Sequence, residues 1–585
     1  MTLPPGVGYL LRLIPRFAIP SAIAYFSLKL LQRQQEIEIS NWIVIPIALL
    51  ARPALFFFNK FYSRRVNKRK AAANGAVLAP SLQLSASRIM SMLGDAIRTG
   101  FPAKVFWDWS KEYGNVYQVD LVTNQILYTT EPDHVKAVLA TQFDSFDKGA
   151  IFHSQMDSLL GTGVFNSDGP MWKFRRAITR PFFTRERISD FEIYDRNCDL
   201  ALKEAKKRLS EGYPIDFQDL VARFTLDSAA EFLFGGDVGS LSAGIPYPPA
   251  HVAKNPPSFY NHPSTAFVNA FMQGLVFAAM RTGMGAEWPL AEFTRDRVAP
   301  LRKVVDKFTE PLMQAALDQR ERELSGKVKP TDDEETLLAH LVKQTQDPKI
   351  LKDELINLLV AGRDTTMCLL AFSLYMLAEH PDIETRLRQE IFEKVGPTES
   401  PGYEQMREMK YMRAFLNEVL RLYPPVPVDS RTTNSPVVLS VKNSSEKPVY
   451  VPANTTCLYA VVNMHRRADL WGPDALEFDP DRFLDERLHK YLTPNPYIFC
   501  PFNAGPRICL GQQFAYHEAT FYLVRLLQQF TGFTLDKSVN IPPPADWASS
   551  GDFTAKETVY PMAHLTMYIK GGLWVHMKEL KSSDI

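Results

Sequence analysis

Two apolar stretches and a basic cluster dominate the hydrophobic pattern at the N-terminus. Residues 10–31 and 41–58 are mostly apolar, although prolines and single arginines interrupt both stretches. A run of lysines and arginines follows at residues 60–70. An apolar segment with a basic end is typical of a membrane anchor whose basic end faces the cytoplasm. We therefore predict an anchor over residues 1–70, with a soluble amphipathic or core helix as the alternative.

The number of membrane crossings stays open at this stage. One crossing puts the N-terminus in the lumen, whereas two crossings, or an interfacial helix followed by one crossing, keep it in the cytoplasm. A cleaved signal peptide is disfavoured, because two apolar segments exceed one signal core and no small-residue cleavage site stands out. Residues 71–86 are rich in alanine and are expected to form a flexible connector. The folded body is assigned to residues 87–585.

The body has a mainly helical pattern with a small β region. Apolar positions recur with helical spacing. Alternating apolar and polar positions predict strands near residues 115–121 and 124–130, and a small antiparallel sheet between residues 439 and 462. A helix is expected to begin at Glu131 and Pro132. Residues 235–263 are rich in proline, glycine and asparagine, which predicts a long irregular loop. The expected helices cover residues 172–187, 196–211, 217–234, 264–280 and 298–324.

The strongest helix signal begins at Asp347 and Pro348. Asp347 is a natural N-cap, and proline is favoured at the first helical position. The apolar period then continues until Pro381, which predicts a helix of about 30 residues, or about 45 Å. Arg363 and Asp364 at its middle make a membrane crossing costly. We therefore expect this helix to cross the interior of a large domain.

Composition narrows the class of protein. Of 585 residues, 22% are charged and 46% are hydrophobic, which is typical of a globular chain. The formal net charge of +1 gives no argument for a nucleic-acid partner. The 5 cysteines are widely spaced, odd in number and without a CxxC pair. A disulfide framework and a zinc finger are therefore disfavoured, and a reducing compartment is favoured.

Polar residues interrupt the central helix at residues 361–366. Glycine is unfavourable inside a helix, and a Thr365 hydroxyl can bond to the carbonyl of Ala361 and locally open the helix. An acid, Asp364, and a hydroxyl would then lie beside a groove suited to a small polar ligand such as dioxygen and water. A buried polar patch of purely structural origin is the alternative interpretation.

A glutamate and two arginines suggest a structural clamp. Glu418 and Arg421 are three positions apart and can meet on one helix face. Arg482, in a turn further along the chain, can dock on the same glutamate. A single pair of this kind is usually a surface ion pair that contributes little. A glutamate shared by two arginines is better evidence for structure than for catalysis.

Cys509 lies in a loop dense with special residues. A lone cysteine cannot close a structural zinc site, and a nucleophile would need a histidine base that the sequence does not place. A third interpretation is a thiolate ligand of haem iron. Gly505 would allow a tight turn, Gly511 would let the backbone approach a flat macrocycle, and Phe502 would pack against it. Arg507 offers a fork for a propionate, and the following helix N-terminus favours thiolate.

Four motifs in this order resemble the cytochrome P450 family of haem-thiolate monooxygenases. They are residues 172–176, 361–366, 418–421 with 480–483, and 502–511, and the resemblance covers about residues 85–575. It implies the cytochrome P450 fold after the anchor, and haem b as cofactor. One departure is the absence of a proline-rich hinge after the anchor, which leaves the orientation of the body on the membrane open.

The resemblance also implies roles for individual residues. Cys509 matches the proximal iron ligand, and Gly362 matches the position where the central helix widens. Asp364 and Thr365 match the pair that delivers protons to dioxygen. The remaining matches are Trp172, Arg176, Arg431 and Arg507 as haem-propionate partners, and Glu418, Arg421 and Arg482 as the structural triad.

The implied reaction inserts one oxygen atom of dioxygen into a C–H bond. Electrons would come from NADPH through a separate cytochrome P450 reductase, with cytochrome b5 as a second donor, at the endoplasmic reticulum membrane with the catalytic domain facing the cytoplasm. No flavin domain is expected after Cys509. An isomerase or dehydratase that needs no reductase, and a haem-based sensor or carrier, are the rival functions; both have less need of the Asp364 and Thr365 pair.

The substrate is expected to be hydrophobic. Residues 224–235 and 503–515 look like those of the fungal branch of the family that hydroxylates alkanes and fatty acids. A long-chain fatty acid or alkane is therefore the first expectation for the substrate. A terpenoid or other secondary metabolite and a polycyclic aromatic are alternatives. Expected pocket segments are residues 151–165, the helices after Pro263, and residues 426–428. Their prominent aromatic residues are Phe152, Phe165, Phe267 and Phe271.

Overall fold

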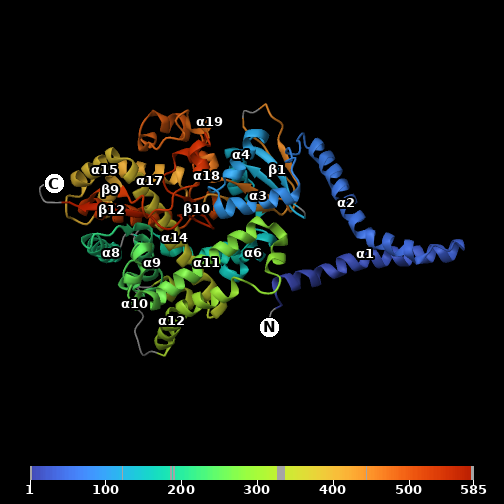
Figure 1. The fold of residues 1–585 in the computed structure, drawn as a ribbon, viewed down its shortest axis with the longest axis horizontal. Helices are drawn as coiled ribbons and strands as arrows, with labels where there is room; N and C mark the ends of the chain where they lie inside the picture. The colour runs from blue at the N-terminus through green and yellow to red at the C-terminus, as the bar shows by residue number, and fades with distance from the viewer. Residues whose placement is uncertain are drawn as a thin grey trace.

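A helix of 32 residues, α14 (Pro348–Glu379), runs through the interior of the body (Figure 1). The computed structural model describes residues 3–121, 123–184, 188, 191–236, 238–325, 336–442 and 445–580. The helix starts as predicted, because the Asp347 carboxylate accepts a hydrogen bond from the Lys349 backbone N–H at 2.9 Å. Its most apolar window is 83% buried. It is therefore a core helix and not a membrane crossing.

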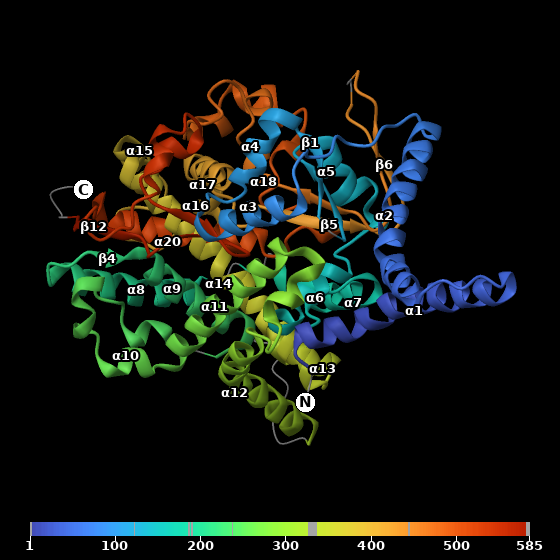
Figure 2. The same cartoon turned by 45° about the vertical axis from the view of Figure 1, so that its right-hand side comes forward.

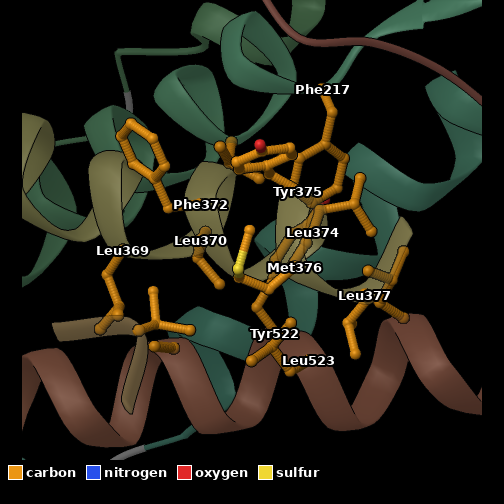
Figure 3. Packing of buried hydrophobic residues seen from close by; sticks show 14 of the residues in the cluster. Phe217, Leu369, Leu370, Phe372, Leu374, Tyr375, Met376, Leu377, Tyr522 and Leu523 are labelled. Carbon is orange, nitrogen blue, oxygen red and sulfur yellow. The ribbon is translucent and has the colours of Figure 1, made fainter. Parts of the chain in front are cut away.

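The second half of α14 forms the largest hydrophobic core together with two other long helices. It packs against α9 (Phe217–Phe234) and α20 (Gln512–Gln529). Leu370, Leu374 and Leu377 are fully buried there (Figure 3). Phe217 and Tyr522 close this core with ring centroids 6.0 Å apart. Burying one such side chain stabilises the fold by about 1.5–3 kcal/mol, so this core holds residues 361–366 in a fixed place.

The mainly helical prediction is confirmed. The helix expected at residues 172–187 is shorter, because Pro181 lacks an amide hydrogen and the chain passes into a 3-10 turn, η4 (Arg180–Phe183); residues 185–187 lie outside the described residues. The other helices of the body are α3 (Ala86–Thr99), α4 (Lys104–Tyr113), α5 (Pro132–Lys136), α6 (Ala150–Leu160), α7 (Gly169–Thr179), α8 (Glu192–Ser210), α11 (Pro263–Gly283), α12 (Ala299–Leu324), α13 (Leu337–Gln344), α15 (Pro381–Lys394), α16 (Tyr403–Glu408), α17 (Lys410–Leu422), α18 (Val461–Met464) and α19 (Ala468–Trp471).

The largest sheet has the order β1-β2-β8-β5-β3. It consists of β1 (Val116–Asp120), β2 (Gln125–Thr129), β3 (Phe146–Asp147), β5 (Asp429–Thr433) and β8 (Thr456–Tyr459). β6 (Val437–Leu439) and β7 (Val449–Val451) form a separate antiparallel pair. The single sheet expected between residues 439 and 462 is therefore wrong, since β8 pairs in parallel with the distant β2. Smaller sheets join β4 (Ile215–Asp216), β12 (Trp574–Glu579) and β9 (Phe530–Leu535), and β10 (Pro561–Ala563) with β11 (Met567–Ile569).

The long loop expected at residues 235–263 is also wrong in part. Three short helices interrupt it: η6 (Ser240–Ala243), η7 (Pro249–Lys254) and α10 (Pro257–Asn261). The buried Asp227 carboxylate accepts hydrogen bonds from the backbone N–H groups of Ser240 and Leu241 at 2.7 and 2.9 Å. These bonds tie the segment to α9, which local sequence could not reveal.

The expected flexible connector at residues 71–86 is docked on the body. Val77 forms a bridge with Val449, and Ser81 forms a bridge with Gln118. The Leu82 backbone N–H donates to the Gln118 carbonyl at 3.0 Å, and Leu82 is buried. The segment therefore extends the edges of two sheets instead of moving freely.

Two apolar helices precede this segment and project from the body (Figures 1 and 2). They are α1 (Pro5–Gln35) and α2 (Asn41–Ala73). Both are long and apolar enough to cross a membrane, and their most apolar windows are 0% and 11% buried. Such exposed apolar surface is unstable in water, which makes the protein membrane-anchored.

Candidate functional site

Most of the residues predicted for the site line one cavity between the Cys509 loop and α14. The two walls are far apart in sequence: Ala361, Gly362 and Thr365 on one side, and Cys509 with its neighbours on the other. The folding of α14 against α20 therefore brings them together. The predicted site residues that line this cavity are Trp172, Arg176, Thr365, Arg431, Phe502, Arg507, Cys509 and Gly511.

The Cys509 loop has the backbone geometry expected of its glycines. Gly505 has a φ of +66°, and a Cβ there would lie 1.9 Å from the Leu139 carbonyl oxygen, so only glycine fits. The Cys509 backbone N–H donates to the Phe502 carbonyl at 3.0 Å. Cys509 is exposed to the cavity, whereas Cys198, Cys368, Cys457 and Cys500 are buried. The loop thus presents one thiol to the cavity.

The environment of Cys509 acts on its pKa in two directions. Burial among its neighbours raises the pKa of the thiol above its usual value, while the Gly511 backbone N–H and Arg176 lower it. The predicted help from the start of α20 is present, because Gly511 is the N-cap of that helix. In the protein alone, burial has a larger effect on the pKa of Cys509 than the helix N-terminus and Arg176 together. A metal cation bound to the sulfur would supply the remaining stabilisation of the thiolate.

The opposite wall is formed by the middle of α14. The Thr365 hydroxyl donates to the Ala361 carbonyl at 2.7 Å, as predicted. The expected opening of the helix is not observed, since residues 361–366 stay helical throughout. A Cβ on Gly362 would lie 2.8 Å from the Ala229 Cβ, so this glycine allows α9 to pack closely against α14.

Asp364 does not reach the cavity. Its side chain is fully buried and forms an ion pair with Arg363, and its Oδ2 has no hydrogen-bond partner. Burial raises the pKa of Asp364, and Arg363 opposes this. The face of α14 that meets the cavity carries Ala361 and Gly362 on one turn and Thr365 and Thr366 on the next, and Asp364 lies outside this face.

Arginines line one edge of the cavity. Arg507 forms an ion pair with Asp168 at 2.6 Å and lies over the Trp172 ring at 4.4 Å, and its buried Nε has no partner. Arg431 pairs with Asp429 at 2.9 Å. Arg176 donates to the Ile508 carbonyl at 2.7 Å, which ties α7 to the Cys509 loop. This edge is therefore rich in cationic donors.

Lys148 lines the same edge, although no sequence motif pointed to this residue. Its Nζ lies 2.9 Å from Asp429 Oδ1. Burial, together with the nearby Arg431, lowers the pKa of Lys148 to about 8 despite the attraction of Asp429. Although burial alone would raise it, Arg431 and Lys148 hold the pKa of Asp429 well below its usual range. Only the pairing of β3 with β5 brings this lysine to the site.

A second cavity adjoins the first, and Lys148 and Asp429 line both. Its walls are mainly apolar and include the predicted Ile151, Phe152 and Val428. Phe165 and Val426 line the first cavity instead. The predicted Phe267 and Phe271 line neither cavity and lie in the core, where Phe267 stacks on Phe308 at 4.4 Å. The spacing of phenylalanines along the sequence could not show which of them line a pocket and which lie in the hydrophobic core.

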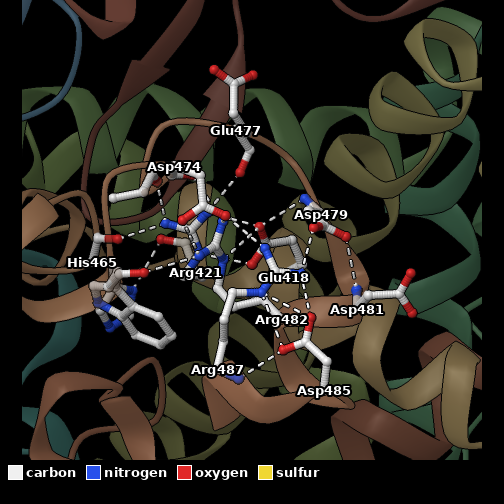
Figure 4. A network of polar contacts seen from close by, with 12 residues as sticks. Glu418, Arg421, His465, Asp474, Glu477, Asp479, Asp481, Arg482, Asp485 and Arg487 are labelled. Atoms are coloured by element: carbon white, nitrogen blue, oxygen red, sulfur yellow. Dashed lines mark hydrogen bonds and ion pairs between the residues drawn. The ribbon is translucent and has the colours of Figure 1, made fainter. Parts of the chain in front are cut away.

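The predicted clamp around Glu418 is present on α17 (Figure 4). Arg421 makes two hydrogen bonds to the Glu418 carboxylate, both 2.7 Å long. Arg482 reaches the same carboxylate at 3.5 Å and also pairs with Asp474 at 3.1 Å. Glu418, Arg421 and Arg482 are at most 1% exposed. The clamp thus joins α17 to η9 (Pro480–Phe483). Its role is to stabilise the packing of these two elements, and its side chains do not face the cavity.

These features together define a class of site. The Cys509 thiol faces a mainly apolar wall of α14 that also carries Thr365 and Thr366, and cationic side chains line one edge. Such an arrangement suits a flat iron macrocycle with carboxylate arms and a thiolate ligand.

Comparison with known proteins agrees with this class. A sequence model described as cytochrome P450 matches residues 83–556. Cytochrome P450 52A5 of Candida maltosa is 32% identical over 92% of this chain and 97% of its own length. Cytochrome P450 52A6 of Candida tropicalis is 35% identical over 82% and 85%, and cytochrome P450 monooxygenase himC of Aspergillus japonicus is 35% identical over 74% and 73%. The chain belongs to the cytochrome P450 family.

Family membership implies haem b with a cysteine thiolate ligand, a redox partner and a hydrophobic substrate. The residues present fit haem. Cys509 supplies a thiol exposed to the cavity, and a Cβ on Gly511 would only touch Phe183 and the Cys509 sulfur at 3.6 and 3.9 Å. Protein packing does not demand glycine there, whereas a macrocycle lying against the loop would. The unpartnered Nε of Arg507 fits a carboxylate arm.

Proposed function

We propose that this monooxygenase hydroxylates a long-chain fatty acid or alkane. The observation that carries the proposal is the apolar second cavity, which adjoins the Cys509 cavity and shares Lys148 and Asp429 with it. An extended chain could lie in the second cavity with one end near Cys509. The likeness of residues 224–235 and 503–515 to the fungal alkane and fatty-acid hydroxylating branch supports the same substrate class.

A terpenoid or other oxygenated metabolite is the second candidate substrate. His564 and Asn124 line the second cavity, and His564 Nε2 and Asn124 Oδ1 are buried without a hydrogen-bond partner. Burial and the nearby Arg363 lower the pKa of His564 to about 3, so the ring is neutral at pH 7. A hydroxyl or carbonyl group on a substrate would satisfy these atoms, which an alkane cannot do.

In the proposed site, the Cys509 thiolate would be the iron ligand. Phe502 and Gly511 would lie beside the haem, and its propionates would be held by Trp172 and by the cationic side chains of Arg176, Arg431, Arg507 and Lys148. When bound, haem supplies the activation of dioxygen, so that one oxygen atom enters the substrate C–H bond and the other leaves as water, with two electrons from NADPH.

Thr365 is the proposed proton-handling group. Its hydroxyl lines the cavity opposite Cys509 and holds its own proton in the hydrogen bond to Ala361. Asp364 is proposed as the proton source behind it. Burial raises the pKa of Asp364, so it keeps a proton to higher pH than a free aspartate does. Because Asp364 lies outside the cavity wall, a side-chain rotation or a water would have to link it to Thr365.

Electrons are proposed to come from NADPH–cytochrome P450 reductase, with cytochrome b5 as a second donor. The proposed location is the endoplasmic reticulum membrane with the catalytic domain in the cytoplasm. The basic cluster at residues 60–70, which follows the apolar part of α2, supports that orientation. The division into an anchor at residues 1–70, a connecting segment at 71–86 and a catalytic domain at 87–585 is part of the same proposal.

Product analysis tests the function. The full-length protein with a fungal reductase and NADPH is given fatty acids, alkanes, terpenoids and polycyclic aromatics. Hydroxylated fatty acids or alkanes are expected, and turnover should vanish in Cys509→Ala but persist in the buried control Cys457→Ala. If only terpenoids gave products, the proposed fatty-acid or alkane substrate would be refuted and the second candidate substrate would be supported. Turnover without NADPH would support an isomerase or dehydratase and refute the monooxygenase.

A further inference from the structure

The two N-terminal helices form a hairpin. α1 packs along α2, and Figures 1 and 2 show them side by side where they project furthest from the body. On the first turns of α2, Val44 and Ala48 are buried, whereas the large apolar side chains around them are exposed. Nearer to the body, the Arg52 guanidinium lies 5.5 Å from the centre of the Phe17 ring, which joins the two helices. The hairpin turn is formed by residues 36–40.

The first turns of α1 dock on the body. They contact η8 (Gly285–Glu292), the segment between α11 and α12. Gly6 is buried there, and a Cβ on it would lie 2.5 Å from Phe293 Cα and 2.9 Å from the Pro289 carbonyl oxygen. The close approach therefore depends on glycine. The far end of α2 returns to the same body through the docked Val77 and Ser81. The hairpin thus leaves the body and comes back to it.

The basic residues of the hairpin lie mostly at its body end. The stem consists of residues 17–32 of α1 and 41–58 of α2, which span about 24 and 27 Å at 1.5 Å per residue. These lengths approach the hydrocarbon thickness of about 30 Å. The turn carries Glu36 and Glu38 with Arg33 beside it, and the stem contains Lys29 and Arg52. Arg12, Arg16 and the six lysines and arginines at residues 60–70 flank the body end. This excess of positive charge at the body end favours the cytoplasm.

The polar turn decides between a shallow and a complete insertion. A hairpin that entered only one leaflet would leave Glu36 and Glu38 in the hydrocarbon interior. Each charge there costs at least about 2.5–3.5 kcal/mol. More than half of the exposed large hydrophobic side chains in the described residues lie between Leu3 and Tyr62, so a lipid bilayer is the surrounding that matches the stem.

We propose that α1 and α2 cross the membrane together as a helical hairpin. The N-terminus and the catalytic body then lie on one side, and residues 36–40 emerge on the other side. The contact of Gly6 with the segment at Pro289 and Phe293 holds the N-terminus against the body. The proposal concerns topology alone and does not depend on the reaction or on the substrate.

Thiol labelling in sealed microsomes tests this topology. Leu3→Cys and Glu38→Cys are compared with the parent chain, using a membrane-impermeant maleimide with and without detergent. Residue 3 should be labelled at once, and residue 38 only after detergent. Labelling of both in intact microsomes would refute the crossing of the turn. Protection of residue 3 would refute the shared side and indicate a single crossing.

Glycosylation gives an independent measurement. An Asn-Gly-Thr acceptor in a Gly/Ser extension is placed either before Leu3 or between Glu38 and Ile39. Only the acceptor in the turn should be glycosylated. The body carries two acceptor sequences of its own, Asn443-Ser444-Ser445 and Asn454-Thr455-Thr456, and the double variant Asn443→Gln, Asn454→Gln is the matched control. Glycosylation at the N-terminus, or no glycosylation at the turn, would overturn the hairpin.

Discussion

Lys148 and Asp429 meet at the boundary between the two cavities, with the lysine Nζ 2.9 Å from the carboxylate Oδ1. Arg431 binds the other oxygen of the same carboxylate at 2.9 Å. Two cations thus share one buried anion, which leaves a net positive edge facing the proposed haem carboxylates. This relationship links strands β3 and β5 to the site.

Replacement of Lys148 should weaken haem binding. In Lys148→Met the shared carboxylate keeps only Arg431, so this cluster becomes neutral and the edge loses one positive charge. A charged hydrogen bond contributes about 1.5–3 kcal/mol, which corresponds to roughly a 10- to 100-fold loss of haem affinity. The measurement is the haem content per polypeptide on dilution. Lys148→Arg keeps the charge and should retain most of the haem; equal loss in both variants would count against the charge argument.

Removal of the Thr365 hydroxyl should uncouple NADPH oxidation from hydroxylation. The side chain lines the cavity, and its hydroxyl is fixed by the Ala361 carbonyl at 2.7 Å. In Thr365→Ala we expect about a tenfold or larger fall in product per NADPH, within the range of general acid–base effects, with peroxide formed instead. Thr365→Ser keeps the hydroxyl and should restore coupling. Unchanged coupling in the alanine variant would refute the proposed role.

Breaking the Glu418 clamp should destabilise the whole body. Arg482→Leu leaves part of a buried carboxylate network unpaired, which costs about 3–5 kcal/mol. Arg386 and Asp481 form an ion pair of 2.7 Å whose side chains are 49% and 41% exposed, and Arg386→Ala is the matched control. That variant should lose about 1 kcal/mol or less. Urea unfolding measures both variants, and equal losses would contradict the structural role of the clamp.

The ion pair of His153 and Asp168 should give a pH-dependent stability. The hydrogen bond from His153 Nε2 to Asp168, 2.7 Å long, raises the pKa of His153 above its usual value although burial opposes it. The stabilisation is therefore complete below the unfolded pKa of about 6.5, and is lost as the pH rises through the higher folded value. His153→Gln should lose up to about 1 kcal/mol at pH 6 and almost nothing at pH 9.

Urea unfolding at both pH values measures this difference. The exposed His489, whose Nδ1 lies 3.5 Å from the neutral Thr493 hydroxyl, provides the control variant His489→Gln. A loss in His153→Gln that is the same at pH 6 and pH 9 would show that packing, and not charge, stabilises this pair.

Local chemistry predicted several elements well. The start of α14 at Asp347 and Pro348 follows from N-cap and proline preferences that involve only neighbouring residues. The bond of Thr365 to Ala361 and the pairing of Glu418 with Arg421 join residues within one helical turn. The positive φ of Gly505 is likewise a property of the loop around Cys509.

The predictions that were wrong concern contacts between residues far apart in the chain. The sequence could not predict that β8 would join β2, or that Phe267 would stack on Phe308 in the core. It also placed Asp364 beside the cavity together with Thr365. The helix turns these neighbours to different faces, and only the packing of α14 decides which face meets the cavity.

The sequence alone determined the cytochrome P450 family, Cys509 as the candidate haem ligand and the presence of two apolar N-terminal segments, because short motifs and composition carry that information. The tertiary structure decided that Lys148 joins the cationic edge, that Asp364 is buried behind the wall, and that the two apolar segments pair as a hairpin against the body. These outcomes depend on contacts between distant segments. Such contacts form only where burial of apolar surface brings the segments together.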